Sequence, residues 1–219
     1  FTKNQVKGNP VQVGIKHIKP GKVSAVVVNS KNSNVATGKQ GYDDCMTVCK
    51  AVANELKIPV TQVFPSSTGV IGRRLPVEKV TAALKGFGDK TQSPADLAGF
   101  AKAIMTTDTF EKVAYRTARI GDATVTINGI AKGSGMIAPD MATMLAFVAT
   151  DAKIPAEILQ ALGMPNARPF PSIGLARRAC FRAIVPRASS DGMFRSEERW
   201  LCVFIRVCGR AETATLDAV

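Results

Sequence analysis

The sequence feature that most constrains the fold is a change of character within residues 129–152. Glycine-spaced polar residues continue to Pro139, and the apolar run Met141 to Val148 follows shortly after. The glycines and the serine after Lys132 suit a tight loop whose backbone closely approaches another group. The apolar run predicts a buried strand. The hydroxyl of Thr143 is therefore expected at the junction between a loop and a strand.

Thr143 on its own would be interpreted as a packing residue, because β-branched side chains commonly fill strands. The whole segment KGSGMIAPDMATML, residues 132–145, is more specific. It resembles the self-cleavage segment of the ornithine acetyltransferases, or glutamate N-acetyltransferases, a family of bifunctional arginine biosynthesis proteins in which an Ala-Thr bond is cut and the freed Thr becomes the nucleophile. The resemblance implies cleavage between Ala142 and Thr143. It makes Thr143 the catalytic nucleophile and a substrate-binding residue.

A second stretch of interest is PSSTGVIGRRLP, which follows the short β-rich run Val60 to Phe64. By composition alone, STGVIG predicts a plain turn before a helix, since Gly and Ser punctuate loops. In the resembled family a Thr-Gly pair forms the oxyanion hole, so the resemblance implies this role for Thr68 and Gly69. The chemistry is sound, because acyl transfer develops negative charge on an oxygen, and a Thr-Gly turn can direct a backbone N–H and a hydroxyl at it.

The same resemblance assigns two further residues to substrate binding. Thr106 lies in AIMTTDT at the end of a predicted helix, where a hydroxyl that ties down the helix end is an equally good interpretation without the family. Lys132 would ordinarily be a solvated surface lysine. Set among glycines just before the nucleophile, it is well placed to meet a substrate carboxylate.

The first predicted elements are two β-rich runs, Val11 to Ile15 and Val23 to Val28, separated by Pro20-Gly21. Together they predict a hairpin. The second run leads into NSKNSNVATGKQG, a loop rich in Asn, Ser and Gly. This loop resembles the family's NSGNAN-type segment, except that Lys31 stands in place of the usual Gly and Ser33 in place of Ala. Because of these two departures, the resemblance does not extend to the local turn geometry.

Apolar periodicity and end signals predict three helices and a second hairpin. The first helix covers Tyr42 to Lys57. Its Cys45 and Cys49 are interpreted as packing residues, because no His or acidic pair completes a metal site. The other helices run from Pro76 to about Gly86 and from Ser93-Pro94-Ala95-Asp96 to about Met105, and the strands Val113–Ile120 and Ala123–Ile127 flank the turn Gly121-Asp122.

The basic composition first suggests nucleic acid as a partner, since 29 Lys and Arg against 17 Asp and Glu give the 219-residue chain a formal charge of +12. The lysines are scattered singly, without a basic stripe or interleaved aromatic residues, so we expect a solvated surface and no nucleic-acid binding. No run of about 18 apolar residues predicts a membrane span, and the N-terminus has no apolar signal core. Five irregularly spaced Cys favour reduced thiols in the cytoplasm over disulfides or a metal site.

The chemistry needs a base, and the only histidine, His17, has no sequence link to a nucleophile motif. Cleavage before Thr143 would create another base, an α-amine with a pKa of about 7.7 to 8.0 that can take the hydroxyl proton. The resemblance implies that Thr143 takes acetyl from N2-acetyl-L-ornithine and passes it to L-glutamate. It also implies no cofactor and no metal, acetyl-coenzyme A as an alternative donor, and a heterotetramer of two cleaved α and β chains.

The resemblance covers Phe1 to about Leu162 and stops at a sharp change in composition. Residues 1–162 hold 16 Lys and 4 Arg, whereas residues 163–219 hold 9 Arg and no Lys. We therefore divide the chain into a partial ornithine acetyltransferase-like domain, residues 1–162, and an Arg-rich tail, residues 163–219, which is unrelated to the family and is interpreted as a shifted reading frame. Because the family's further substrate-binding segments do not follow, we expect this chain by itself to transfer no acetyl group.

The expected fold is α/β, with mixed β-sheets packed between α-helices as in ornithine acetyltransferases and Thr-nucleophile aminopeptidases, and incomplete at both ends. Two alternative functions stay open beside acetyl transfer. A non-catalytic α/β binding fragment would keep the Ala142–Thr143 bond intact. A Thr-nucleophile aminopeptidase of related fold would hydrolyse a peptide amide.

Overall fold

The computed structural model describes residues 1–2, 4–87, 97–134, 145–156 and 158, together with the backbone of two further strands. The helices are α1 (Asn9–His17), α2 (Gly38–Leu56), α3 (Val77–Leu84) and α4 (Leu97–Ala103), with the short 3-10 helix η1 (Val60–Gln62). The strands are β1 (Ala25–Asn29), β2 (Val63–Ser67), β3 (Lys112–Ile120), β4 (Ala123–Lys132), β5 (Leu145–Thr150), β6 (Cys202–Val207) and β7 (Leu216–Ala218).

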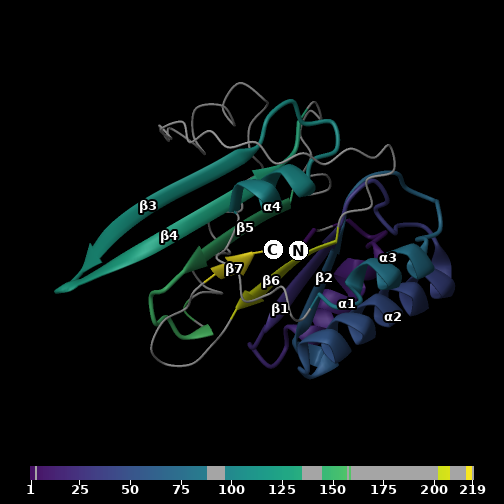
Figure 1. Ribbon diagram of the computed structural model, residues 1–219, viewed down its shortest axis with the longest axis horizontal. Coiled ribbons are helices and arrows are strands. Elements are labelled where there is room, and N and C mark those ends of the chain that lie inside the picture. Colours follow the sequence, from purple (N-terminus) through teal and green to yellow (C-terminus); the bar gives the residue numbers. More distant parts are fainter. Residues whose placement is uncertain are drawn as a thin grey trace.

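The strands form two sheets with helices packed against them. The first sheet has the order β2-β1-β6-β7, in which β1 pairs in parallel with β2 and antiparallel with β6. The second sheet has the order β3-β4-β5 and is antiparallel throughout. Helices α1, α2 and α3 lie together beside the first sheet, whereas α4 lies against the second (Figure 1). This arrangement confirms the expected α/β class with mixed sheets.

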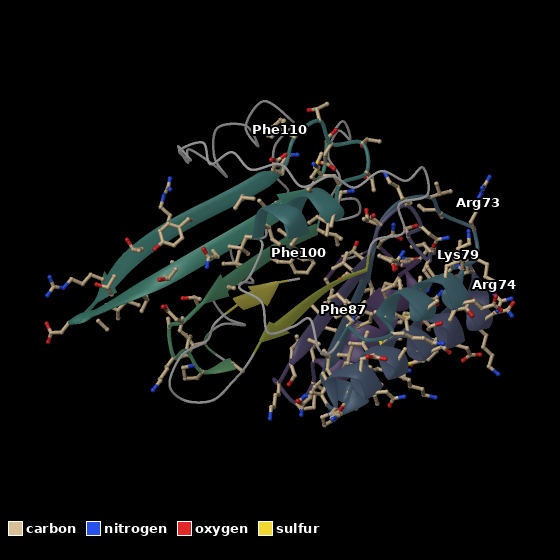
Figure 2. All side chains as sticks on the ribbon, viewed as in Figure 1. Arg73, Arg74, Lys79, Phe87, Phe100 and Phe110 are labelled. Atoms are coloured by element: carbon tan, nitrogen blue, oxygen red, sulfur yellow. The ribbon has the colours of Figure 1, made fainter. Side chains whose placement is uncertain are left out.

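Strand β1 separates two hydrophobic cores, and all five of its residues are buried. Successive side chains of a strand point to opposite faces of the sheet. Val27 accordingly belongs to a core shared with α1, α2 and α3, whereas Val28 belongs to a second core with Phe100 of α4 and Ile130 of β4. The ring centroid of Phe100, labelled in Figure 2, lies 5.5 Å from that of Phe147 in β5. Strand β1 is therefore packed on both of its faces.

The predicted strand Val11 to Ile15 is wrong, because these residues belong to α1, and the opening hairpin is therefore absent. Pro10 lies in the first turn of this helix, where the fixed φ of proline and its missing N–H are tolerated. Of the three β-branched residues that suggested a strand, only Val13 is fully buried. Gly14 packs so closely on Phe64 that an added Cβ would lie 2.9 Å from a ring carbon. This tertiary packing outweighs the β-propensity of the segment.

The predicted strand Val60 to Phe64 begins later than expected, and the predicted strand Met141 to Val148 is described only from Leu145 onward. Val60–Gln62 form η1, so that β2 starts only at Val63. Residues 141–144 lie outside the described residues, and the described part of the predicted strand Met141 to Val148 begins at Leu145 as β5. The expectation of a wholly buried strand is wrong for this part, since Val148 is 73% exposed. The reason is that β5 is an edge strand of an antiparallel sheet, which can leave one face open to solvent.

The other predicted elements agree with the structure where it describes them. Helix α2 begins one turn before Tyr42 and buries Cys45 and Cys49 as free thiols in the first core. A hydrogen bond with Cys49, together with burial, raises the pKa of the Cys45 thiol, which keeps it protonated. The hairpin of β3 and β4 turns at Gly121-Asp122 as predicted. The predicted start of the third helix, residues 93–96, lies outside the described residues.

Strands β6 and β7 come from the Arg-rich segment of residues 163–219. The backbone of β6 pairs with β1 from Val26↔Ile205 to Asn29↔Cys202. The division of the chain at residue 162 stays a prediction. Among the described residues, the helices are all too short or too polar to cross a membrane.

Candidate active site

The candidate site forms where the loops that follow β1 and β2 meet. Because these strands are parallel, their last residues, Asn29 and Ser67, are register partners at one edge of the sheet. The backbone N–H of Thr68 donates to the carbonyl oxygen of Asn29 at 3.0 Å. Two residues further on, the N–H of Val70 donates to the carbonyl oxygen of Lys31, also at 3.0 Å. The predicted oxyanion pair is thus part of a backbone bridge between two loops.

Gly69 occupies a position that no other residue can take without a shift of the neighbouring chain. Its φ is +133°, in the region that favours glycine. An added Cβ would lie 2.2 Å from the carbonyl carbon and 2.4 Å from the carbonyl oxygen of Lys31. The loop after β1 therefore presses directly on the Thr68-Gly69 turn and holds it in place.

Lys31, which stands where the resembled family has Gly, has a φ of +78°. A side chain in this left-handed region costs about 1–2 kcal/mol for a residue other than Gly. The backbone at Lys31 therefore keeps a conformation that suits glycine, although the residue is a lysine. Lys31 is itself exposed.

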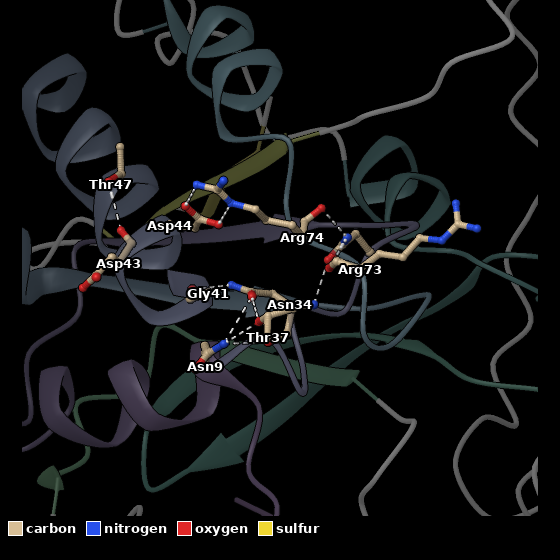
Figure 3. A network of polar contacts seen from close by, with 10 residues as sticks. Asn9, Asn34, Thr37, Gly41, Asp43, Asp44, Thr47, Arg73 and Arg74 are labelled. Carbon is tan, nitrogen blue, oxygen red and sulfur yellow. Dashed lines mark hydrogen bonds and ion pairs between the residues drawn. The ribbon is translucent and has the colours of Figure 1, made fainter. Parts of the chain in front are cut away.

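Buried asparagines hold the loop after β1 in place through hydrogen bonds. From the sequence, these residues indicated only a loop rich in Asn, Ser and Gly. The amide of Asn32 donates to the carbonyl oxygens of Arg73 and Arg74 at 2.9 and 3.2 Å. The side chain of Asn34 is fully buried and joins Asn9, Thr37 and Gly41, as Figure 3 shows. In Figure 2, Arg73 and Arg74 lie at the end of the molecule away from the β3–β4 hairpin. The asparagines thus act as internal cross-links of the site's scaffold.

Lys132 brings three of the predicted site residues together. It is the last residue of β4 rather than part of the following loop, and it is only 2% exposed. Its ammonium Nζ donates to the hydroxyl Oγ1 of Thr68 at 2.9 Å and to that of Thr106 at 2.7 Å. Thr68 follows β2, Thr106 follows α4, and Lys132 ends β4. The site is therefore a meeting point of both sheets and α4.

Asp108 is the residue that sequence reasoning missed. Its side chain is 0% exposed, and its carboxylate accepts hydrogen bonds from Lys112 Nζ at 2.7 Å, from the backbone N–H of Gly133 at 2.8 Å and from that of Thr106 at 3.3 Å. Burial alone would raise the pKa of Asp108, but these hydrogen bonds and the charge of Lys112 hold the pKa below its usual value. The only sequence signal was its place two residues after Thr106 in AIMTTDT.

The charge on Lys132 is set by opposing influences. Burial lowers the pKa of Lys132, and the positive charges of Lys112 and Lys31 lower it further. The carboxylate of Asp108 acts in the opposite direction. Because the net effect is a lowered pKa, Lys132 gives up its proton more readily than a surface lysine does.

Ala142 and Thr143, the predicted cleavage pair, lie outside the described residues. The described chain on either side of them lies beside Lys132. Lys132 and Leu145 are register partners in the β4–β5 pair. On the other side, the hydroxyl of Ser134 donates to the carbonyl oxygen of Thr107 at 3.2 Å. The chain therefore leaves Lys132 for the predicted cleavage segment and returns from it at the same end of β4.

His17 has a structural contact at the opposite end of β2. Its ring Nδ1 lies 2.7 Å from the carbonyl oxygen of Val63, and the residue is buried. Val63 begins β2, whereas Thr68 follows its end, so the strand separates them by about 16 Å at roughly 3.3 Å per residue. The described residues contain no group of three His, Cys, Asp or Glu side chains arranged to hold a metal ion.

A family model and individual relatives of known sequence all point to the same protein family. The model of the ArgJ family matches residues 1–173. Over 162 residues the chain is 49% identical to the arginine biosynthesis bifunctional protein ArgJ of Bradyrhizobium diazoefficiens, which covers 74% of this chain and 39% of that protein. The protein of the same name from Listeria monocytogenes is 45% identical over 163 residues, or 74% of this chain and 40% of its own length. The chain thus spans about two fifths of the length of these relatives.

Two solved structures resemble the fold. The crystal structure of arginine biosynthesis bifunctional protein ArgJ from Bacillus halodurans matches with a TM-score of 0.56 and 35% identity, over 68% of this chain and 74% of that chain. Ornithine acetyltransferase from Mycobacterium tuberculosis, complexed with ornithine, matches with a TM-score of 0.51 and 31% identity, over 68% and 75%.

Proposed function

This chain belongs to the ArgJ family, whose members compared above are bifunctional proteins of arginine biosynthesis, and on that premise we propose that it carries the self-cleavage segment and part of the active site of a glutamate N-acetyltransferase. The reaction is the transfer of acetyl from N2-acetyl-L-ornithine to L-glutamate. The acetyl group passes through an ester on Thr143. Acetyl-coenzyme A is an alternative donor, and no cofactor or metal takes part.

The observation that carries the proposal is the contact of Lys132 with Thr68 and Thr106. These residues are far apart in the sequence. The family resemblance assigned Thr68 to the oxyanion hole, and Thr106 and Lys132 to substrate binding. In the fold they meet within hydrogen-bond distance at the carboxyl edge of the β1–β2 pair, the usual place for a binding site in such sheets. Gly69, the other half of the oxyanion pair, is fixed next to them by the backbone of Lys31.

Self-cleavage is the first step of the proposed mechanism. The Thr143 hydroxyl attacks the Ala142 carbonyl, and the acyl group moves from nitrogen to oxygen. Water then hydrolyses the ester, which leaves the carboxylate of Ala142 and the free α-amine of Thr143. That amine takes the hydroxyl proton in later steps, because its unperturbed pKa of about 7.7 to 8.0 is near neutrality.

Acetyl transfer follows in two half-reactions. The Thr143 oxygen attacks the acetyl carbonyl of N2-acetyl-L-ornithine, and ornithine leaves after its amine gains a proton. The amine of L-glutamate then attacks the acetyl ester, and Thr143 is released with its proton restored. In each half-reaction the hydroxyl of Thr68 and the backbone N–H of Gly69 stabilise the oxyanion. The proposed assembly is a heterotetramer of two cleaved α and β chains.

The test uses this chain continued past residue 162 with the corresponding C-terminal part of the Bradyrhizobium diazoefficiens relative. We expect mass spectrometry to find two fragments, split between Ala142 and Thr143, and the cleaved protein to form N-acetylglutamate from the two substrates. The variant Thr143→Ala should stay whole and inactive. Identical fragments from both proteins would contradict the proposal. An uncut protein without transfer would favour a binding fragment, and hydrolysis of a peptide amide would favour an aminopeptidase.

A further inference from the structure

The hydrogen bonds of Lys132 determine what the hydroxyl of Thr68 can do. An ammonium group has three N–H donors and no acceptor, so both threonine hydroxyls must accept from Lys132. A hydroxyl carries one hydrogen and two lone pairs. Because the oxygen of Thr68 accepts at 2.9 Å from a buried cation, its hydrogen must point elsewhere. Among the described residues, no acceptor takes that hydrogen.

The position of Thr68 leaves this hydrogen a restricted choice of direction. The residue is 6% exposed, and its backbone N–H is bonded to the carbonyl oxygen of Asn29. Its neighbour Gly69 is wedged against Lys31. The Thr68 oxygen is therefore fixed on one side by its backbone and on another by Lys132. Acceptance from a cation also polarises the hydroxyl, and this makes it a stronger donor.

We propose that Lys132 is a positioning residue for the oxyanion donor: by bonding to the Thr68 oxygen, it turns the Thr68 hydrogen toward the reacting carbonyl and strengthens it as a donor. This inference rests on the proposed function and extends it, because Lys132 acts through Thr68 and not solely on a substrate carboxylate. Thr106 is the second acceptor, and it fixes the direction of the Lys132 side chain.

The surroundings of Lys132 act on its ammonium form in opposite directions, with a lowered pKa as the net result. The facing charged groups are Asp108 beside the turn after α4, Lys112 at the start of β3 and Lys31 in the loop after β1. Of these three charged groups, Asp108 is the one that favours the ammonium form. Each threonine oxygen that accepts from Lys132 also favours it, so removal of an accepting hydroxyl should lower the pKa of Lys132 further.

A first experiment tests this contact in the full chain, without any need for turnover. Lysine labelled with ¹³C at Cε is titrated by NMR, and the Lys132 signal is assigned from its loss in Lys132→Met. We expect Thr68→Val, which keeps the shape and removes the hydroxyl, to lower the pKa of Lys132. The matched control is Thr81→Val on α3, whose hydroxyl donates to the carbonyl oxygen of Val77. A Lys132 pKa that is the same in Thr68→Val and in the parent chain would overturn the proposal.

A second experiment measures the coupling during acetyl transfer, in the chain extended with the C-terminal part of the relative. Lys132→Met should lower kcat about 100-fold, the usual loss when an oxyanion donor is impaired. In the Thr68→Val background the same substitution should lower kcat by less than about 3-fold, because the hydroxyl on which Lys132 acts is already absent. The exposed Lys50→Met on α2 controls for the loss of one positive charge.

The outcomes separate the two proposals. Lys132→Met could instead raise KM and leave kcat unchanged, with an effect that is the same in the parent and in the Thr68→Val background. In that case Lys132 only binds substrate, so the inference is wrong while the proposed function stands. If the parent protein neither cleaves itself nor transfers acetyl, the proposed function is wrong and the inference falls with it. Thermal unfolding of each variant shows whether a loss of kcat reflects a loss of fold. Should Lys132→Met unfold, Lys132→Arg supplies the signal assignment, and the titration of Thr68→Val decides the contact.

Discussion

At the scale of single residues, Gly69 is the position with the least room for change. We expect Gly69→Ala to lower the free energy of unfolding by at least about 2 kcal/mol, because overpacking and an unfavourable φ act together. The Cβ would meet backbone atoms of Lys31, which cannot move aside as a flexible side chain could. Denaturant unfolding of the two proteins measures the difference.

Gly72 provides the matched control for this substitution. Its φ of +79° is also positive, but no atom lies within 4 Å of the position of an added Cβ. Gly72→Ala should therefore show only the conformational cost, about 1 kcal/mol. Equal losses in the two variants would mean that the contact between Gly69 and Lys31 contributes nothing to stability.

The site residues themselves could be singled out from the sequence, but their contact could not. The family resemblance pointed to Thr68, Thr106 and Lys132 one by one. The hydrogen bonds from Lys132 span 64 and 26 positions, a separation at which no helical or strand period operates. The family resemblance did not point to Asp108. Its carboxylate is recognised only in the structure, because the three groups that donate to it come together only in the folded chain. Whether Thr68, Gly69, Thr106, Lys132 and Thr143 have the assigned roles stays a prediction.

At the scale of elements, Asp108 ties the turn after α4 to the start of β3 and the end of β4. Its folded pKa lies below the unfolded value, so its carboxylate stabilises the fold above about pH 3.9. This contribution is lost as the pH falls through the folded pKa, because the unfolded chain then binds more protons. We expect Asp108→Asn to be less stable than the parent at neutral pH and to lose less stability on acidification.

Thermal unfolding from pH 7 down to pH 3 measures this effect. The control is Asp122→Asn in the β3–β4 turn, where the carboxylate is fully exposed and 3.7 Å from Arg119. That variant should follow the parent curve at each pH. Parallel curves for the parent and Asp108→Asn would contradict the stabilising role of the partly buried ion pair between Asp108 and Lys112.

Helices and strands could be predicted from the sequence where neighbouring residues alone determine the element. The β3–β4 hairpin was predictable because the Gly121-Asp122 dipeptide specifies the turn on its own. The helix α1 was not, since its alternating Val and Ile favour a strand and the contact of Gly14 with Phe64 overrides them. The predicted start of β2 was wrong as well, because Val60–Gln62, whose composition favours a strand, form the 3-10 helix η1.

At the scale of the whole molecule, the described members of the two hydrophobic cores fall between Val13 and Phe147, in the family-matched part of the chain. We expect residues 1–162 alone to keep a cooperative thermal transition, although loss of β6 leaves one edge of β1 unpaired. Differential scanning calorimetry of the full and the shortened chains tests this. A transition that disappears on shortening would show that residues 163–219 are an integral part of the fold.

Because β4 pairs with β5, the proposed cleavage would change how the protein can refold. Their register runs from Ile127↔Thr150 to Lys132↔Leu145, and a cut between Ala142 and Thr143 would leave one strand of the pair on each product. While the connection is intact, the strands meet at an effective concentration of roughly millimolar; once it is cut, they meet only at the concentration of the protein in solution. Refolding then becomes a second-order process. The protein would be assembled once as a single chain, and after cleavage its persistence would depend on never fully coming apart.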